Sequence, residues 1–196
     1  QGKFDELPKL PLGCIGIEQG NLIRIGDMRF QINVTPQQAQ ILWAELSTRA
    51  WPAGSGCWDW LNIRSGIPVI LPQTQEQFVA QMANLDLVNG VSFKKGCYPG
   101  QEIVARMQYL GKLKRRMYLA HIDSTETPQA GDELFSADDE IQLSRHRMEG
   151  QASGMLANAA AAPAGGYDVL AVLQTSSRET QTVHWKSQQG AALQFL

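Results

Sequence analysis

The second half of the chain is built from short stretches in which apolar and polar residues alternate, and this pattern constrains the fold more than any other. Alternation with a period of two is typical of strands that bury one face. Gly, Pro, Asp and Ser separate the stretches, so each strand is expected to end in a turn. Six short strands at this spacing predict a small antiparallel barrel or sandwich. The expected strands are residues 116–122, 133–135, 141–143, 150–157, 169–173 and 182–185.

Residues 12–17 and 22–34 also predict strands from their alternation. Gly26-Asp27 interrupts the second stretch and suits a tight two-residue hairpin turn. Residues 57–63 fit a helix or a strand, and residues 72–90 predict irregular structure with one helical turn. Together with a helix that follows the hairpin, these elements are typical of an α+β unit.

That helix is predicted to begin at Thr35-Pro36. Threonine is a favourable N-cap, and proline is favourable at the first helical position because its missing N–H would have no partner there. The apolar residues that follow are spaced by three, four and seven positions, which is typical of one buried helix face. They are Ala39, Leu42, Trp43 and Leu46.

Positive charge is concentrated in one short part of the chain. Of 17 Lys and Arg residues, seven lie between Lys94 and Arg116, where Glu102 is the single acid. The rest of the chain carries ten basic and eighteen acidic side chains, so a mildly acidic protein presents one basic stretch. Such a stretch suits an anionic ligand, or it is a solvated strand edge where lysine discourages aggregation.

Cys97 lies within this basic stretch, directly after Lys94-Lys95-Gly96. Pro99 suits the first position of a helix, which would place Cys97 just before a helix N-terminus. A helix N-terminus and neighbouring lysines lower the pKa of a thiol and raise its reactivity. These residues favour a reactive thiol, and the alternative is a small, buried structural cysteine.

The other two cysteines, Cys14 and Cys57, have apolar neighbours and are interpreted as structural residues. Three widely spaced cysteines form neither a disulfide framework nor a metal-binding motif, so reduced thiols and a cytoplasmic location are expected. The histidines His121, His146 and His184 are expected at the surface or as satisfied core residues. No apolar run approaches the length needed to cross a bilayer.

Residues 95–102, KGCYPGQE, resemble the K-G-C-[Y/F]-x-G-Q-E signature of the YgfZ family. Members of this family are folate-binding relatives of the glycine-cleavage T-protein, an aminomethyltransferase. WLNIRSGIPV at 60–69 is similar to the family's W-L-x-x-x-I-x-x-G-x-P segment, and QMANLDL at 81–87 is similar to its P-Q-x-x-N-L stretch. Residues 104–106, VAR, match the V-A-R that follows the signature.

The resemblance implies an α+β fold class. Residues 1–112 would form the later part of a ferredoxin-like, T-protein-like folate-binding domain. Residues 113–196 would form a small C-terminal antiparallel β-barrel. The resemblance and the absence of an initial methionine also imply a piece of a longer protein that has an N-terminal portion.

Carried over residue by residue, the resemblance implies that Cys97 is the functional thiol. The implied function is a folate-binding accessory protein in iron–sulfur cluster assembly or repair that supports tRNA-modifying iron–sulfur enzymes. The expected cofactor is tetrahydrofolate, and the expected partners are folate, iron–sulfur enzymes including those that thiolate tRNA, and tRNA itself, with no membrane and no bound metal. The residues assigned to cofactor binding are Lys95, Gly96, Tyr98, Gly100, Gln101, Glu102 and Arg106.

Two other functions fit parts of the same sequence. A tetrahydrofolate-dependent aminomethyltransferase would share the fold, although the cysteine in the signature argues against it because that chemistry needs a positioned carboxylate. A tRNA-binding module would use the basic stretch for phosphates, with Tyr98 and Tyr109 available to stack on bases. The sequence leaves open whether the chain turns over a substrate.

Overall fold

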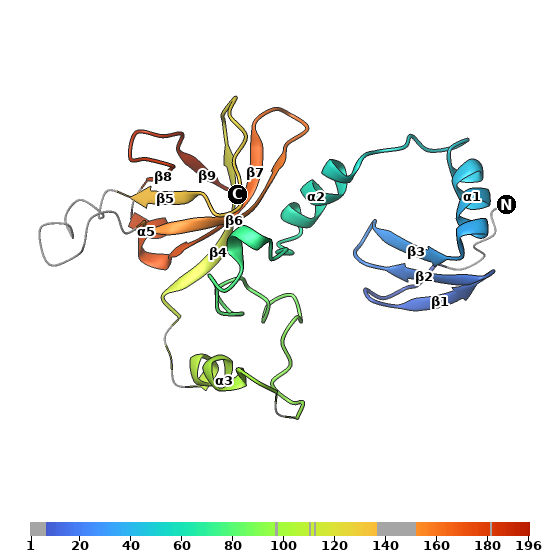
Figure 1. Ribbon diagram of the computed structural model, residues 1–196, viewed down its shortest axis with the longest axis horizontal. Coiled ribbons are helices and arrows are strands. Elements are labelled where there is room, and N and C mark those ends of the chain that lie inside the picture. The colour runs from blue at the N-terminus through green and yellow to red at the C-terminus, as the bar shows by residue number, and fades with distance from the viewer. Residues whose placement is uncertain (1–6, 97, 110, 112, 137–151, 181) are drawn as a thin grey trace, which may run out of the picture. The chain divides into compact units, whose positions relative to one another are not determined.

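The computed structural model describes residues 7–96, 98–109, 111, 113–136, 152–180 and 182–196. The chain divides into two compact units, residues 1–53 and 54–196. Each unit contains at least one helix and a sheet, which confirms the α+β class (Figure 1). The division expected at residues 112/113 stays a prediction, since compactness alone does not define a domain.

The first unit contains a three-stranded antiparallel sheet in the order β1-β2-β3. The strands are β1 (Cys14–Ile17), β2 (Gly20–Arg24) and β3 (Phe30–Val34). They confirm the two strand-forming stretches expected in this part of the chain. Whether this unit belongs to a ferredoxin-like domain stays a prediction.

The turn between β2 and β3 is wider than the two-residue turn expected at Gly26-Asp27. Arg24 pairs with Phe30, so five residues lie between the strand ends. The Arg24 guanidinium donates hydrogen bonds to Gly26 O at 3.1 Å and to Asp27 O at 2.7 Å. The Arg24 side chain thus provides hydrogen-bond donors for two carbonyl groups of the wider loop.

Helix α1 (Pro36–Leu46) begins as expected, with Thr35 Oγ1 accepting a hydrogen bond from Gln38 N at 3.4 Å. Its buried side is different from the one expected. Gln38 and Leu42 are buried, whereas Trp43 is 62% exposed and Leu46 is 42% exposed. The buried residues are one turn apart, so a small sheet covers a narrower stripe of the helix than its apolar residues occupy.

The second unit begins with α2 (Ser55–Arg64), which shows that the ambiguous residues 57–63 form a helix. The following residues are irregular apart from one 3₁₀ turn, η1 (Pro72–Thr74), as expected. Helix α3 (Gln101–Tyr109) then precedes the strands. In the described part of the chain, no helix is both long enough and apolar enough to span a membrane.

The strands of the second unit form a six-stranded antiparallel sheet in the order β8-β5-β6-β7-β4-β9. A bridge between His184 and Ala192 joins its two ends, so the sheet is a nearly closed barrel. This confirms the barrel expected from the alternating pattern. The strands are β4 (Arg115–Ile122), β5 (Glu133–Ser136), β6 (Gly154–Ala161), β7 (Tyr167–Gln174), β8 (Val183–Trp185) and β9 (Leu193–Phe195).

The described elements of the barrel region differ from the expected ones in the bounds of one strand and in two additional short elements. The strand expected at 150–157 begins at Gly154 and continues to Ala161. Helix α5 (Thr175–Thr180) and strand β9 were not expected, because each is too short to show a clear period. The strand expected at 141–143 lies outside the described residues.

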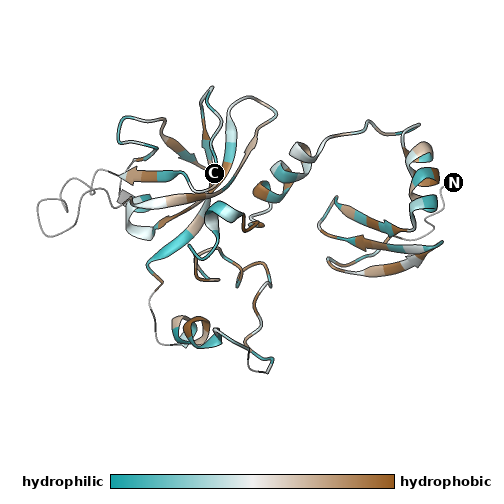
Figure 2. Cartoon of the chain, in the orientation of Figure 1, coloured by the Kyte–Doolittle hydropathy of each residue, from teal (hydrophilic) through white to brown (hydrophobic). Residues whose placement is uncertain are grey.

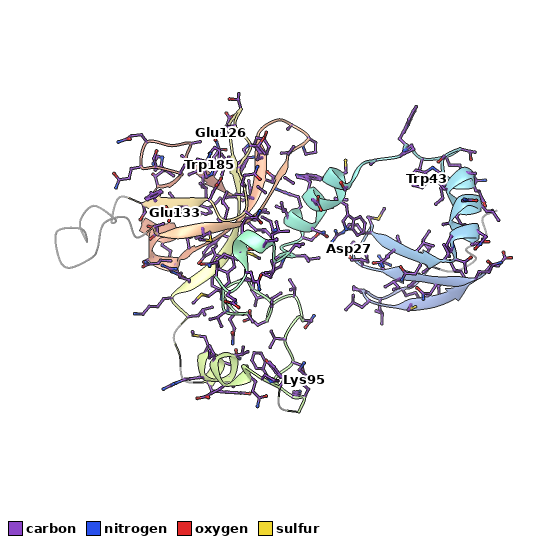
Figure 3. All side chains as sticks on the ribbon, viewed as in Figure 1. Asp27, Trp43, Lys95, Glu126, Glu133 and Trp185 are labelled. Carbon is purple, nitrogen blue, oxygen red and sulfur yellow. The ribbon has the colours of Figure 1, made fainter. Side chains whose placement is uncertain are left out.

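The barrel encloses the main hydrophobic core. Hydrophobic residues follow its strands in Figure 2, and the largest of them are fully buried. Trp185 on β8 (labelled in Figure 3) is also buried. Its indole nitrogen donates to Asp132 Oδ2 at 2.8 Å. The core residues include Ala120, Ile122, Leu134, Leu156, Val169, Ala171, Leu173 and Val183.

Candidate functional site

The described residues of the KGCYPGQE signature lie where an irregular stretch, residues 91–96 and 98–100, leads into α3 (Figure 1). The first of these residues, Lys95, is exposed on that stretch (Figure 3). Cys97, the expected functional thiol, lies outside the described residues. The geometry of the site is therefore given by the residues on either side of it.

A turn formed by Tyr98, Pro99, Gly100 and Gln101 connects the signature to α3. Gln101 N donates to Tyr98 O at 3.2 Å, and Gln101 Oε1 accepts from Tyr98 N at the same distance. Gly100 has φ +79°, a left-handed conformation that favours glycine.

The expectation that Pro99 occupies the first helical position is wrong, because α3 begins two residues later at Gln101. The left-handed Gly100 cannot belong to a right-handed helix, so the helix starts after it. Three residues of the sequence, Tyr98 to Gly100, therefore separate Cys97 from the first residue of α3. This spacing weakens the argument that a helix N-terminus activates the thiol, because that effect falls off within one turn.

The structure brings only some of the signature residues together. Lys95 Nζ lies 4.7 Å from the centre of the Tyr98 ring, which is a cation–π distance. Glu102 and Arg106 are exposed in the first and last turns of α3, where their charges suit the helix dipole. No side-chain hydrogen bond or ion pair joins Glu102 or Arg106 to the described residues of the signature.

The backbone at Gly96 has open space beside it. A Cβ built at this position would meet no atom within 4 Å, and the same holds at Gly100. The described residues leave room at both glycines for close approach of another group. The glycine at 100 is required by its backbone conformation, whereas no such requirement applies at 96.

The other two cysteines are exposed and free, so interpreting them as buried structural residues was wrong. Cys14 is the first residue of β1, where exposure alternates along the strand. Cys57 lies in the first turn of α2. The apolar neighbours of these cysteines in sequence do not predict that the cysteines are buried. Alternate strand positions and successive helix positions point in different directions, so neighbours in sequence lie on different faces.

The stretch QMANLDL at 81–87 is tied to the first strand of the barrel by Arg116. The Arg116 guanidinium forms a two-pronged ion pair with Asp86, with N–O distances of 2.8 and 3.0 Å. Asn84 Nδ2 donates to Met117 O at 2.7 Å. Arg116 therefore has a structural partner, in contrast to several other cations of the basic stretch.

Gln81 connects the same stretch to α3. It is 2% exposed, and its Nε2 donates to Val104 O at 2.6 Å. Its backbone carbonyl accepts from Arg116 at 3.0 Å. Its Oε1 is buried and has no hydrogen-bond partner among the described residues. In the sequence, Gln81 is recognisable only as part of a family pattern. That pattern does not indicate that its side chain is buried and bonded to α3.

A buried carboxylate, Asp168 on β7, holds α2 against the barrel. It is 4% exposed and accepts from Trp60 Nε1 at 2.8 Å. Its other oxygen lies 2.8 Å from His121 Nδ1, and Arg64 is 3.6 Å away. The sequence contains one signal for this residue, an aspartate inside an otherwise apolar strand.

Asn158 fixes a second point between the same regions. Its side-chain amide accepts from Val69 N and donates to Val69 O, both at 2.9 Å. The residue follows a β-bulge in β6 between Leu156 and Asn158, which changes the pairing register. Family segment 60–69 is thus attached to the barrel at both ends, by Trp60 and by Val69.

The histidines that the structure describes are satisfied, as expected. His121 contacts Asp168, and His184 Nδ1 lies 2.9 Å from Gly190 O. His146 lies outside the described residues. Within those residues, no group of three or more His, Cys, Asp or Glu side chains is arranged to hold a metal ion.

Among the pockets that the described residues of 54–196 form are two that no described residue of the signature lines. The larger, about 330 Å³, lies between α2 and β6, and its lining includes Asp59, Asn62 and Asn158. The smaller, about 180 Å³, lies between Phe78 and the barrel, where Arg115 and Glu133 both contribute to its wall. Most of the described residues of the signature are exposed, namely Lys95, Gly96, Pro99, Gly100 and Glu102.

The sequence of this chain is similar to those of several curated proteins. A protein of Pectobacterium carotovorum named tRNA-modifying protein YgfZ is 36% identical over 142 residues, which is 71% of this chain and 41% of the relative. Proteins of the same name from Photobacterium profundum and Yersinia pestis are 39% and 41% identical, over 60% and 54% of this chain. No model of a protein family matches the chain.

The chain belongs to the YgfZ family over the region that it shares with these proteins. It spans about two fifths of the length of the curated relatives that it matches. The family expected from the sequence is thereby confirmed, whereas the correspondence of the signature and of segments 60–69 and 81–87 to the family's motifs stays a prediction.

Proposed function

We propose that this chain is part of a folate-binding accessory protein for iron–sulfur cluster assembly or repair, serving enzymes that modify tRNA. Cys97 is its functional thiol. The observation that carries the proposal is an intact KGCYPGQE signature in a chain related to proteins named tRNA-modifying protein YgfZ. A thiolate is both a nucleophile and a metal ligand, which suits chemistry at a cluster or at a one-carbon unit.

The groups around the signature are compatible with tetrahydrofolate. The pterin ring carries N–H donors, from which the exposed Glu102 carboxylate is able to accept hydrogen bonds. The carboxylates of the folate tail suit Lys95 and Arg106. The open space beside the backbone at Gly96 leaves room for close approach. When bound, tetrahydrofolate supplies a carrier for one-carbon units.

Other contacts within the signature determine the conformation of this segment. Gly100 and Gln101 form the turn that precedes α3, and Lys95 lies over the Tyr98 ring. A cation held over an aromatic ring is partly positioned before any ligand arrives, which lowers the entropy lost on binding. In the proposal, these residues present Cys97 and the charged groups to the folate and to the client enzyme.

Replacement of Cys97 by serine tests the thiol role. We expect Cys97→Ser, made in the longest natural form of the protein, to fail to restore thiolated tRNA nucleosides in a bacterium that lacks its own relative, as measured by mass spectrometry. Tetrahydrofolate titrated calorimetrically into the same variant should still bind, because serine removes the nucleophile and keeps the volume.

The control is Cys57→Ser, since Cys57 is exposed and free and lies in α2, outside the signature. It should restore the nucleosides as fully as the unchanged protein. Full restoration by Cys97→Ser would overturn the thiol role. Absence of tetrahydrofolate binding by the unchanged, full-length protein would overturn the folate role.

A further inference from the structure

Four exposed cations between residues 94 and 114 have no acidic partner among the described residues. We call Lys94, Lys95, Arg106 and Lys114 the basic cluster, and each is exposed. The ion pairs of the described chain involve other bases, namely Arg64, Arg116, His121 and Lys186. Arg116 is adjacent in sequence but is committed to Asp86. The basic cluster thus keeps its positive charge available to an external anion.

Aromatic rings lie among these cations. The rings of Phe93 and Tyr109 are 6.5 Å apart and meet edge to face at 72°, so the stretch before α3 contacts the end of the helix. This contact brings Lys94, next to Phe93, to the same end of α3 as Arg106. Tyr109 is nevertheless 71% exposed. Its phenol ring is thus available to a second planar group.

The alternative explanation, that these lysines protect a strand edge, does not fit their positions. Lys94 and Lys95 lie in an irregular stretch, and Arg106 lies on α3. Lys114 comes before the first residue of β4. Protection against edge pairing requires the charge to be on a strand. Another role is needed for Lys94 and Lys114, which the proposed folate site does not use, in a chain whose net charge is −2.

We propose that the basic cluster binds RNA, with the cations contacting phosphates and Tyr109 stacking on an unpaired base. Interleaved cations and exposed aromatic rings are the arrangement by which proteins bind single-stranded and looped nucleic acid. An anionic membrane surface would use the cations but not the stacking ring. This inference goes beyond the proposed function, since an accessory protein for tRNA-modifying enzymes need not contact RNA itself.

Salt dependence of tRNA binding tests the proposal. The probe is an unmodified, fluorescently labelled tRNA transcript, and fluorescence anisotropy gives its Kd with this chain at 50 and 200 mM salt. If three or four phosphates are neutralised, counterion release raises Kd by about 40- to 150-fold over that range. No binding at 50 mM salt, or a Kd that does not change with salt, would overturn the proposal. Binding to vesicles rich in anionic lipid without binding to the transcript would also overturn it.

Two double variants separate local charge from net charge. Lys94→Glu with Lys114→Glu reverses two members of the basic cluster and leaves the KGCYPGQE signature unchanged. The control, Lys9→Glu with Arg49→Glu, makes the same change in net charge at exposed positions of the first unit. We expect the first variant to raise Kd at least tenfold and to lower the slope of log Kd against log salt by about two. The control should stay within threefold, and equal losses in both variants would contradict a local site.

Tyr109→Ala tests the stacking contact. It should raise Kd by about 5- to 100-fold without changing the salt slope, because a stacked base contributes no counterion release. An unchanged Kd would remove Tyr109 from the site. Far-UV circular dichroism of every variant checks that α3 and the barrel are retained. Retained tetrahydrofolate binding by the lysine variants would distinguish loss of RNA binding from loss of the proposed folate function.

Discussion

Single polar residues on barrel strands decide how the irregular part of the second unit is held. Asn158 and Asp168 are 8% and 4% exposed, and both bind groups that precede the barrel in sequence. A buried polar group without a partner is costly, so each of these side chains specifies one arrangement of the segment that it contacts. Glycines on the same strands act in a different way: they allow neighbouring strands to approach closely.

Gly154→Ala should destabilise the barrel. Gly154 pairs with Leu173 across β6 and β7, and a Cβ at 154 would overlap Val172 O and lie 2.7 Å from Leu173 Cβ. Overpacking of this kind costs about 1–3 kcal/mol. Urea unfolding followed by fluorescence should show this loss in the free energy of unfolding.

Gly56→Ala is the matched control for that substitution. Gly56 lies in α2, where a Cβ would meet no atom within 4 Å. Alanine has the higher helix propensity, so the free energy of unfolding should stay constant or rise by up to about 1 kcal/mol. Equal effects at both glycines would show that the strand contact is not as tight as the structure indicates.

At the scale of elements, hydrogen bonds to side chains attach α2 and the irregular stretch to the barrel. Trp60 on α2 binds Asp168 on β7, and Arg116 on β4 binds Asp86. Helix α3 is connected through one buried side chain, Gln81, which binds Val104 O. None of the residues of α3 is buried, so the signature is presented on an element that contributes little to the core.

Trp60→Phe should loosen the attachment of α2. Phenylalanine keeps most of the packing volume but removes the N–H that donates to the buried Asp168 carboxylate at 2.8 Å. A hydrogen bond to a charged group contributes about 1.5–3 kcal/mol, so the free energy of unfolding should fall by about that amount.

The control for this change is Trp51→Phe, because Trp51 is 96% exposed. Its effect on stability should lie within about 0.5 kcal/mol. Hydrogen exchange should also accelerate in residues 55–64 of the Trp60 variant alone. A Trp60 variant as stable as the original would mean that the indole–carboxylate bond adds nothing over solvation of the two groups.

At the scale of the whole molecule, the two compact units differ in the core that each contains. The barrel core, which includes Ile122, Leu134 and Leu156, lies wholly within residues 54–196. The first unit buries few large apolar side chains, chiefly Leu22 and Leu42. Units of about 50 residues with so small a core are marginally stable by themselves.

Residues 54–196 should therefore fold when produced alone. We expect a cooperative thermal transition within about 5 °C of the main transition of the whole chain, since the domain keeps its complete core. Trp185 fluorescence and near-UV circular dichroism report the packing of the barrel. A fragment with strand content but no near-UV signal would show that residues 1–53 are needed for barrel packing.

Local features of the sequence determined a large part of the result. Alternating residues predicted β4 to β8 and the barrel, and Thr35-Pro36 predicted the start of α1. The KGCYPGQE signature indicated the family before any comparison. Such features need only a few consecutive residues, because strand period and helix capping arise from the local backbone. The position of Cys97 and its chemistry stay predictions.

Only the tertiary structure decided which faces are covered and which polar residues are paired. It turned Trp43 outward on α1, exposed Cys57, and started α3 at Gln101 after a left-handed glycine. Asp168 binds a tryptophan 108 positions earlier, and Asn158 binds a backbone 89 positions earlier. These contacts join residues far apart in sequence, and a pattern read over one turn or one strand contains no information about such partners.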